Sequence, residues 1–160
     1  MLQAVNNNSV LSDDPALQYM ELSLGNARIL VRQSDIFSIE SLKDINSGNP
    51  ANHSAGSIYF NEKMILVYSL SEQLELEHSI AENKTVCAVL NKGNVLISLA
   101  CMEIAPFKHR ILKLHSLPEC MQASASPIEA LCLYKKDNDN DIKCVISTDS
   151  LARYIDEHNI

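Results

Sequence analysis

The feature that most constrains the fold is a pair of apolar runs near the middle of the chain, separated by a short polar turn. The first run is Gly56 to Phe60, the turn is Asn61-Glu62-Lys63, and the second run is Met64 to Leu70. A short polar turn between two apolar runs is typical of antiparallel strands in a β-hairpin. The sequence therefore predicts a hairpin at 56–70.

The same outline recurs three more times along the chain. The paired runs are Tyr19–Leu24 with Ala27–Val31, Thr85–Leu90 with Val95–Met102, and Ile128–Tyr134 with Ile142–Ile146, the last pair joined by a polar loop at 135–141. In the first pair, apolar and polar residues alternate, which indicates a strand buried on one face. In the third pair, both arms are apolar on successive residues, which indicates strands buried on both faces.

Helical signals are few and lie between or after these hairpins. A turn or two of helix is expected within 71–82, and Ser34 is expected to cap a brief helical entry at 34–37 that leads to a strand at Ile39. Near the end of the chain, the apolar face formed by Leu151, Tyr154 and Ile155 predicts a C-terminal helix, and Asp149 is expected to cap it. The segments 41–55 and 106–127 are expected to be polar connections.

Repeated short hairpins are expected to close into small barrels, because closure removes exposed strand edges. Apolar residues make up 46% of the chain, but only 5% is aromatic and there is no tryptophan, so the core must be aliphatic. Residues 1–16 are rich in Asn, Ser and Asp, and are expected to form a flexible arm before a folded domain at 17–160. The sequence thus predicts a mainly β fold with a short C-terminal helix.

The charge of the chain argues against two classes of partner. The formal net charge is −7, and the few Lys and Arg residues are scattered. A surface of this sign repels nucleic-acid phosphates and anionic membranes. The longest apolar run, 95–102, is also far shorter than the ~20 residues that a membrane-spanning helix needs. We therefore expect no nucleic-acid partner and no membrane insertion.

The cysteines predict a reducing compartment. There are five, an odd number, without a Cys-x-x-Cys pair, and four of them lie in apolar runs where a thiol behaves as a small hydrophobe. The first nine residues have neither the basic start nor the apolar stretch of a signal peptide. A cytoplasmic protein without disulfides is the expectation.

No catalytic or metal-binding constellation is apparent. Cys101, Cys120, His109 and His115 could form a zinc site, but their spacings match no closed-site signature. The polar loop at 135–141 lacks the glycine and the distal glutamate of a calcium loop. We expect no cofactor, no metal and no enzymatic activity. A small metal-dependent enzyme that uses the Cys/His set is the less favoured alternative.

The hairpin at 56–70 resembles that of the CheW-like domain family, the chemotaxis coupling proteins. The apolar and glycine positions of the family pattern are occupied by Gly56, Ile58, Phe60, Val67 and Leu70. The polar hallmarks differ: Asn61 and Glu62 stand where the family has Arg-Gly, Leu66 where it has proline, and Ser69 where it has aspartate. The resemblance extends over about residues 17–155 in the order and spacing of the strands.

The resemblance implies two intertwined five-stranded β-barrels that share an aliphatic core. It also implies a non-enzymatic adaptor in a bacterial chemosensory or type IV pilus-type system, one that couples a chemoreceptor to a histidine kinase. The positions that match the family's partner contacts are Ile36, Ser38, Gly56, Asn61 and Cys87.

Two interpretations of the hairpin turn remain open. Asn61 and Glu62 are either an altered recognition tip or an ordinary solvated turn, since Asn tolerates left-handed backbone. Asn61 cannot provide the charged five-donor group of an arginine. A divergent CheW-like scaffold that has lost receptor coupling is therefore the alternative to the adaptor. Ile58, Phe60 and Val67 could line a groove, but core positions are favoured for such residues.

Overall fold

The computed structural model describes residues 18–47, 53–122 and 126–158. The predicted arm at 1–16 lies outside these residues. The elements run, in chain order, as β1 (Tyr19–Ser23), β2 (Arg28–Arg32), the 3-10 turn η2 (Gln33–Asp35), β3 (Ile36–Ser41), β4 (Asn46–Ser47), β5 (Gly56–Phe60), β6 (Lys63–Leu70), β7 (Leu76–Glu77), β8 (Val86–Lys92), β9 (Val95–Cys101), β10 (Glu103–Pro106), β11 (Arg110–Ser116), α2 (Glu119–Gln122), β12 (Ile128–Lys136), β13 (Asp139–Ile146) and α3 (Thr148–His158).

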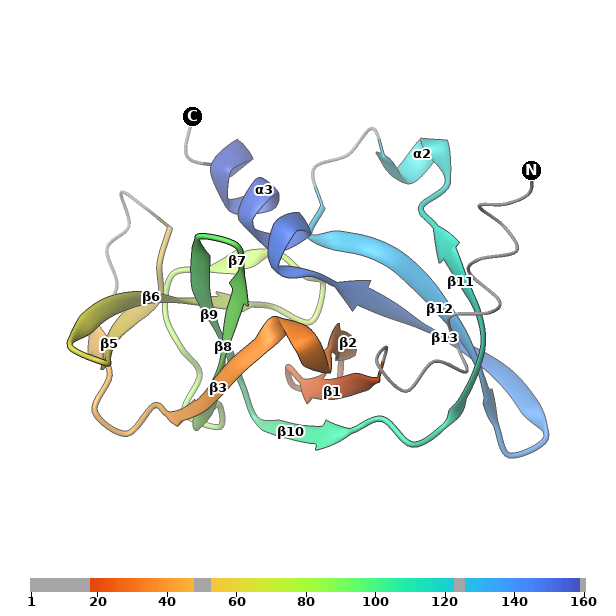
Figure 1. Cartoon of the computed structure of the whole chain (residues 1–160), viewed down its shortest axis with the longest axis horizontal. Coiled ribbons are helices and arrows are strands. Elements are labelled where there is room, and N and C mark those ends of the chain that lie inside the picture. Colours follow the sequence, from red (N-terminus) through yellow and green to blue (C-terminus); the bar gives the residue numbers. More distant parts are fainter. Residues whose placement is uncertain (1–17, 48–52, 123–125, 159–160) are drawn as a thin grey trace.

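The strands form two sheets that lie side by side (Figure 1). The first sheet has the order β10-β1-β2-β13-β12-β11, and the second has the order β3-β8-β9-β6-β5-β4, with β7 paired to β6. The first sheet takes its strands from both ends of the chain, while the second is built from the middle. Helix α3 packs against β8 and β9 of the second sheet and against β12 of the first. The predicted mainly β fold with a short C-terminal helix is confirmed.

Both sheets curl, and the number of strands in each sheet is close to the predicted five. In the first sheet, β10 pairs with β1 and β11 pairs with β12, although only residues 107–109 separate β10 from β11. If β10 and β11 are counted as one bent strand, this strand joins the two ends of the sheet and closes it into a ring of five strands. In the second sheet, Phe37 of β3 and Phe60 of β5 approach to 5.7 Å between ring centroids. The two-residue strands β4 and β7 are additions that the sequence did not predict.

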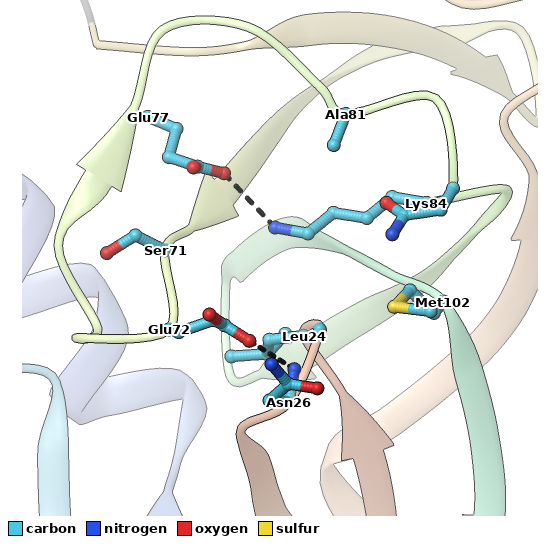
Figure 2. A pocket seen from close by; sticks show the side chains of 10 residues that line it. Leu24, Asn26, Ser71, Glu72, Glu77, Ala81, Lys84 and Met102 are labelled. Atoms are coloured by element: carbon cyan, nitrogen blue, oxygen red, sulfur yellow. Dashed lines mark hydrogen bonds and ion pairs between the residues drawn. The ribbon is translucent and has the colours of Figure 1, made fainter.

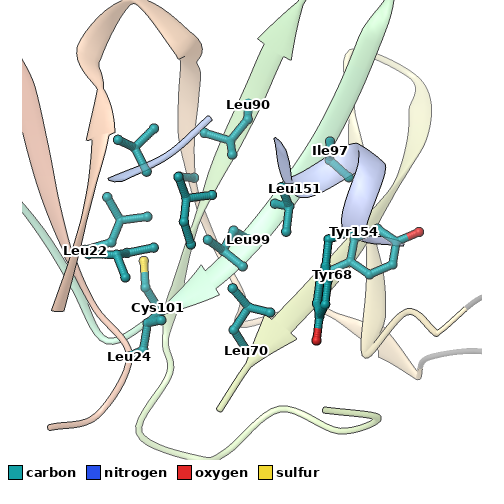
Figure 3. Packing of buried hydrophobic residues seen from close by; sticks show 14 of the residues in the cluster. Leu22, Leu24, Tyr68, Leu70, Leu90, Ile97, Leu99, Cys101, Leu151 and Tyr154 are labelled. Atoms are coloured by element: carbon teal, nitrogen blue, oxygen red, sulfur yellow. The ribbon is translucent and has the colours of Figure 1, made fainter. Parts of the chain in front are cut away.

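The core consists of three clusters of buried residues, one shared between the sheets and one inside each. The shared cluster joins β1 and β2 to β6, β8, β9 and α3 (Figure 3). Along β8, Ala88 and Leu90 face the shared cluster, whereas Cys87 and Val89 face the cluster inside the second sheet. The predicted burial of this strand on both faces is confirmed. Aliphatic side chains dominate the shared cluster and the cluster inside the second sheet, whereas the cluster inside the first sheet also contains Tyr19 and Tyr134.

Two predicted hairpin loops are shorter in the structure. At the 56–70 hairpin, Lys63 begins β6 and pairs with Phe60, so the turn is Asn61-Glu62 alone. Both residues have positive φ, 51° and 65°, as a two-residue type I′ hairpin turn requires. The predicted loop at 135–141 is wrong, because β12 and β13 stay paired as far as Lys136 and Asp139. These strand ends are exposed, so polar residues pair there without burial.

Two further predictions for the connections are wrong. The segment 71–82 contains β7 in place of a helix, and Leu74 has a positive φ of 64° that no α-helix accommodates. The connection at 106–127 contains the strand β11 and the short helix α2. The predicted helical entry to β3 is present as η2, but Ser34 does not cap it.

The C-terminal helix is confirmed, with Leu151, Tyr154 and Ile155 buried on one face. Its cap differs from the prediction. Ser147 Oγ accepts a hydrogen bond from the Ser150 amide at 3.0 Å, and Ser150 Oγ accepts one from the Ser147 amide at 2.9 Å. This reciprocal pair satisfies amides at the helix start in place of Asp149.

Candidate protein-interaction surface

The five positions that match the family's partner contacts all lie on the second sheet or its hairpin turn. Ile36 and Ser38 are on β3, Gly56 is on β5, Asn61 is in the β5–β6 turn and Cys87 is on β8. Strands β3 and β8 are paired neighbours, and the contact between Phe37 and Phe60 brings β3 to the hairpin. The structure thus gathers the five positions on one sheet but exposes them unequally.

Two of these positions are buried. A Cβ atom at Gly56 would overlap Ile45 Cδ1 and lie 2.7 Å from the Asn46 carbonyl oxygen, so glycine is required where β4 pairs with β5. Cys87 is fully buried in the cluster inside the second sheet, and burial raises the pKa of its thiol. Neither position presents a side chain at the surface. Both shape the sheet on which any partner would dock.

The other three positions are accessible. Ile36 and Ser38 are half-buried, and the Ser38 hydroxyl hydrogen-bonds to Glu40. Asn61 is exposed at the tip of the hairpin. Its left-handed backbone is a conformation that Asn adopts more readily than most residues, so the turn chemistry alone explains its presence.

Four large apolar side chains that the sequence analysis did not single out are exposed next to these positions. They are Phe37 (56% exposed) and Ile39 (50%) on β3, and Tyr59 (71%) and Met64 (59%) on the hairpin. We call these four residues the apolar rim. Tyr59 and Met64 are direct cross-strand partners on one face of the hairpin. On the opposite face, Ile58 is buried in the core, as favoured from the sequence.

The apolar rim has a sequence signal, but an ambiguous one. Alternation along β5 and β6 separates Ile58 and Ile65 from Tyr59 and Met64. Farther along β6, the face that carries Met64 becomes buried, because Leu66 and Tyr68 pack into the shared cluster. Which part of an apolar face is covered depends on the placement of the first sheet and α3, and this placement is not encoded in the local pattern.

The remaining candidate residues do not converge. Cys101 is fully buried on β9, and burial raises the pKa of its thiol to about 12, whereas Cys120 is exposed on α2. His109 stacks near Phe107 and Tyr134, with ring centroids 5.4 Å away in each case. Across residues 18–47, 53–122 and 126–158, no group of three or more His, Cys, Asp and Glu side chains is arranged to hold a metal ion.

The described helices are all too short or too polar to cross a membrane. The second sheet offers a hairpin with a tight turn that exposes Tyr59 and Met64 on one face. The edge strand β3 exposes Phe37 and Ile39, and it reaches the other face of the hairpin through the contact of Phe37 with Phe60. Aromatic residues and Met are enriched in protein–protein interfaces. The composition of this surface is therefore typical of protein–protein interfaces.

Comparison with known proteins identifies the fold. No protein-family model and no curated protein sequence matches the chain. Among solved structures, the chain is similar to the crystal structure of the scaffolding protein TtCheW from Thermoanaerobacter tengcongensis, with a TM-score of 0.59 and 13% sequence identity. The match covers 82% of this chain and 88% of TtCheW. The chain therefore has the CheW-like fold.

Proposed function

We propose that this chain is a non-enzymatic adaptor that works in the cytoplasm of a bacterial chemosensory or type IV pilus-type system, where it couples a receptor to a histidine kinase. The observation that carries the proposal is the apolar rim. It lies on the same sheet as the positions at which the family resemblance implies partner contacts, within a CheW-like fold.

The apolar rim has the properties of a docking surface. Burying a large apolar side chain on binding contributes about 1.5–3 kcal/mol. The backbone at Tyr59 and Met64 is held by a two-residue turn, so little backbone conformational entropy is lost when a partner covers them. A partner helix or strand with matching apolar side chains would fit this surface.

Charge adds a second expectation about the partner. With a net charge of −7, the protein attracts surfaces that carry Lys or Arg. Long-range attraction of this kind accelerates association and is screened by salt. Association with the partner should therefore slow as the salt concentration rises, while dissociation, which depends on the apolar contact, changes less.

A second candidate function is a scaffold that has lost receptor coupling, and Asn61 favours it. The family resemblance implies an arginine at this turn position, and an amide cannot replace its charge or its five donors. The variant Asn61→Arg separates the two candidates, with Asn61→Gly as the control that keeps the left-handed turn. Receptor binding that strengthens only in Asn61→Arg would indicate an attenuated adaptor. Unchanged binding in both variants would indicate a different assembly.

The adaptor proposal is tested by isothermal titration calorimetry against the regulatory domain of a chemosensory histidine kinase and the cytoplasmic tip of a chemoreceptor from the same genome. We expect binding by at least one of them, weakened tenfold or more in the double variant Tyr59→Ser/Met64→Ser. The control is Ile142→Ser on the first sheet, because Ile142 is as exposed (56%) as the apolar rim. Absence of binding to both domains, or equal weakening by the control, would contradict the proposal.

A further inference from the structure

A cavity of about 340 Å³ lies where the two sheets meet (Figure 2). From the first sheet it is lined by the β1–β2 loop and from the second by the chain between β6 and β8, with Met102 between β9 and β10. Its volume is at the lower end of the range of about 300–1,000 Å³ typical of ligand pockets. The side chains that define its chemistry are Glu72, Glu77, Lys84, Leu24 and Met102.

The buried lysine of this cavity is fully engaged. The Lys84 side chain is 3% exposed, and its Nζ atom donates to Ser69 Oγ at 2.7 Å, to the Leu70 carbonyl oxygen at 2.7 Å and to Glu77 Oε1 at 3.2 Å. An ammonium group has three donors, so none remains for a ligand. The cavity therefore has no free lysine donor for an anion, although it contains a cation.

The two carboxylates, in contrast, keep free acceptor capacity. Glu77 Oε1 accepts hydrogen bonds from Lys84 and from Ser69 Oγ, and one Glu72 oxygen, Oε2, accepts one from the Asn26 amide. Among the described residues, the second oxygen of each carboxylate has no hydrogen-bond donor. Figure 2 shows Glu72 and Glu77 on one side of the cavity, with the Lys84 side chain extending from the other side toward Glu77. Two carboxylates and one ammonium leave a net charge of −1 in the cavity.

The β1–β2 turn contacts one oxygen of the exposed Glu72 carboxylate. The β1–β2 turn at Gly25 has a φ of +125°, and a Cβ atom there would lie 2.8 Å from Glu72 Oε2. Glycine thus lets the turn approach the carboxylate, and the Asn26 amide holds it there. Leu24, Met102 and Ala81 supply apolar wall beside the carboxylates.

We propose that this cavity receives an arginine side chain of a partner protein, an inference that rests on the proposed adaptor function. The apolar wall suits the aliphatic stem, and the two half-free carboxylates suit a planar guanidinium with five donors. Arginine is more weakly hydrated than lysine and so is better suited to a partly enclosed ion pair. The negative net charge of the chain favours a partner that presents such a residue.

The probe for this proposal is Nα-acetyl-arginine amide, with Nα-acetyl-citrulline amide as the neutral analogue of nearly the same shape. Titration of the full-length chain, followed by amide chemical shifts in NMR, should give saturable shifts at 24–26, 71–72 and 81–84 with arginine. Citrulline should bind at least tenfold more weakly. Equal binding of the two compounds, or shifts elsewhere only, would overturn the proposal.

The matched variants are Glu72→Gln and Glu75→Gln. Gln at 72 keeps the oxygen that accepts from Asn26 but removes the charge, and we expect tenfold weaker arginine binding. Glu75 is exposed on the same segment and does not line the cavity, so its variant should bind as the wild type does. Loss of binding in both variants would indicate a general charge effect and overturn the proposal.

The same variants separate this inference from the adaptor function. If the kinase or receptor domain binds, Glu72→Gln should weaken that binding tenfold and Glu75→Gln should not. Partner binding that Glu72→Gln leaves unchanged would overturn the arginine site but leave the adaptor intact. Saturable binding of the arginine compound without binding of either partner domain would contradict the adaptor function, but it would still support an arginine-binding cavity.

Discussion

Val89 offers the sharpest test of the packing on which the second sheet depends. It is fully buried in the middle of β8 and lies between Ser38 of β3 and Ser98 of β9 in the strand register. Its side chain faces the cluster inside the second sheet, together with Ile65 and Val67. A carboxylate placed at this position would contact no water, and no cationic side chain belongs to the cluster.

The expected cost of Val89→Asp follows from two contributions. Loss of the buried valine removes about 1.6 kcal/mol of transfer free energy, at ~0.8 kcal/mol for each of two methyl groups, plus a cavity contribution. An unpaired buried charge adds several kcal/mol. Since domains of this size have a free energy of unfolding of roughly 5–15 kcal/mol, we expect Val89→Asp not to fold.

The assay is urea denaturation followed by circular dichroism, with two controls. Val89→Ala should fold but lose about 2–3 kcal/mol of unfolding free energy, because it leaves a cavity without a charge. Val95 lies at the exposed start of β9, opposite Lys92, so Val95→Asp should lose less than about 1 kcal/mol of unfolding free energy. A cooperative unfolding transition of wild-type midpoint in Val89→Asp would refute the assignment of β8 to the core.

Two further predictions concern the second sheet and the thiols. Gly56→Ala should lower the free energy of unfolding by about 1–3 kcal/mol in the same assay, because its methyl group would overlap Ile45; an unchanged midpoint would refute the close packing of Ile45 and β4 against Gly56. With a thiol reagent at pH 8, the exposed Cys120 should react in the native protein, whereas Cys101 and Cys132 should react only on unfolding, since burial raises their pKa to about 12 and about 11. Because these pKa values lie above the unfolded value of 9.0, the free energy of unfolding should fall as the pH rises above 9, and a flat profile between pH 9 and 11 would contradict this.

The hairpins could be predicted because their signals are local. The direct succession of apolar residues in each arm of the pair Thr85–Leu90 and Val95–Met102 indicates strands buried on both faces, and β8 indeed contributes to two clusters. The predicted turn has the correct position but is one residue too long. It included Lys63 because this residue is polar, whereas in the structure Lys63 pairs with Phe60 in the hairpin. Pairing of backbone groups at an exposed hairpin end does not require apolar side chains.

The features that were missed depend on contacts distant in sequence. Strand β11 lies in a segment with polar ends, and it forms because it pairs with β12 and continues the ribbon from β10. The apolar rim is another case. Met64 and Tyr68 share one face of β6, but only Tyr68 is covered by the shared cluster, so exposure of Met64 follows from the placement of α3 and the first sheet.

The central claim is that the second sheet, with its apolar rim, docks a partner protein. Hydrogen exchange of backbone amides, measured by mass spectrometry with and without the histidine-kinase regulatory domain, tests it directly. We predict slower exchange in the complex at 36–41 and 57–66, and unchanged exchange in the exposed hairpin end at 134–143 of the first sheet. Slower exchange confined to 134–143, with 36–41 and 57–66 unaffected, would contradict the account.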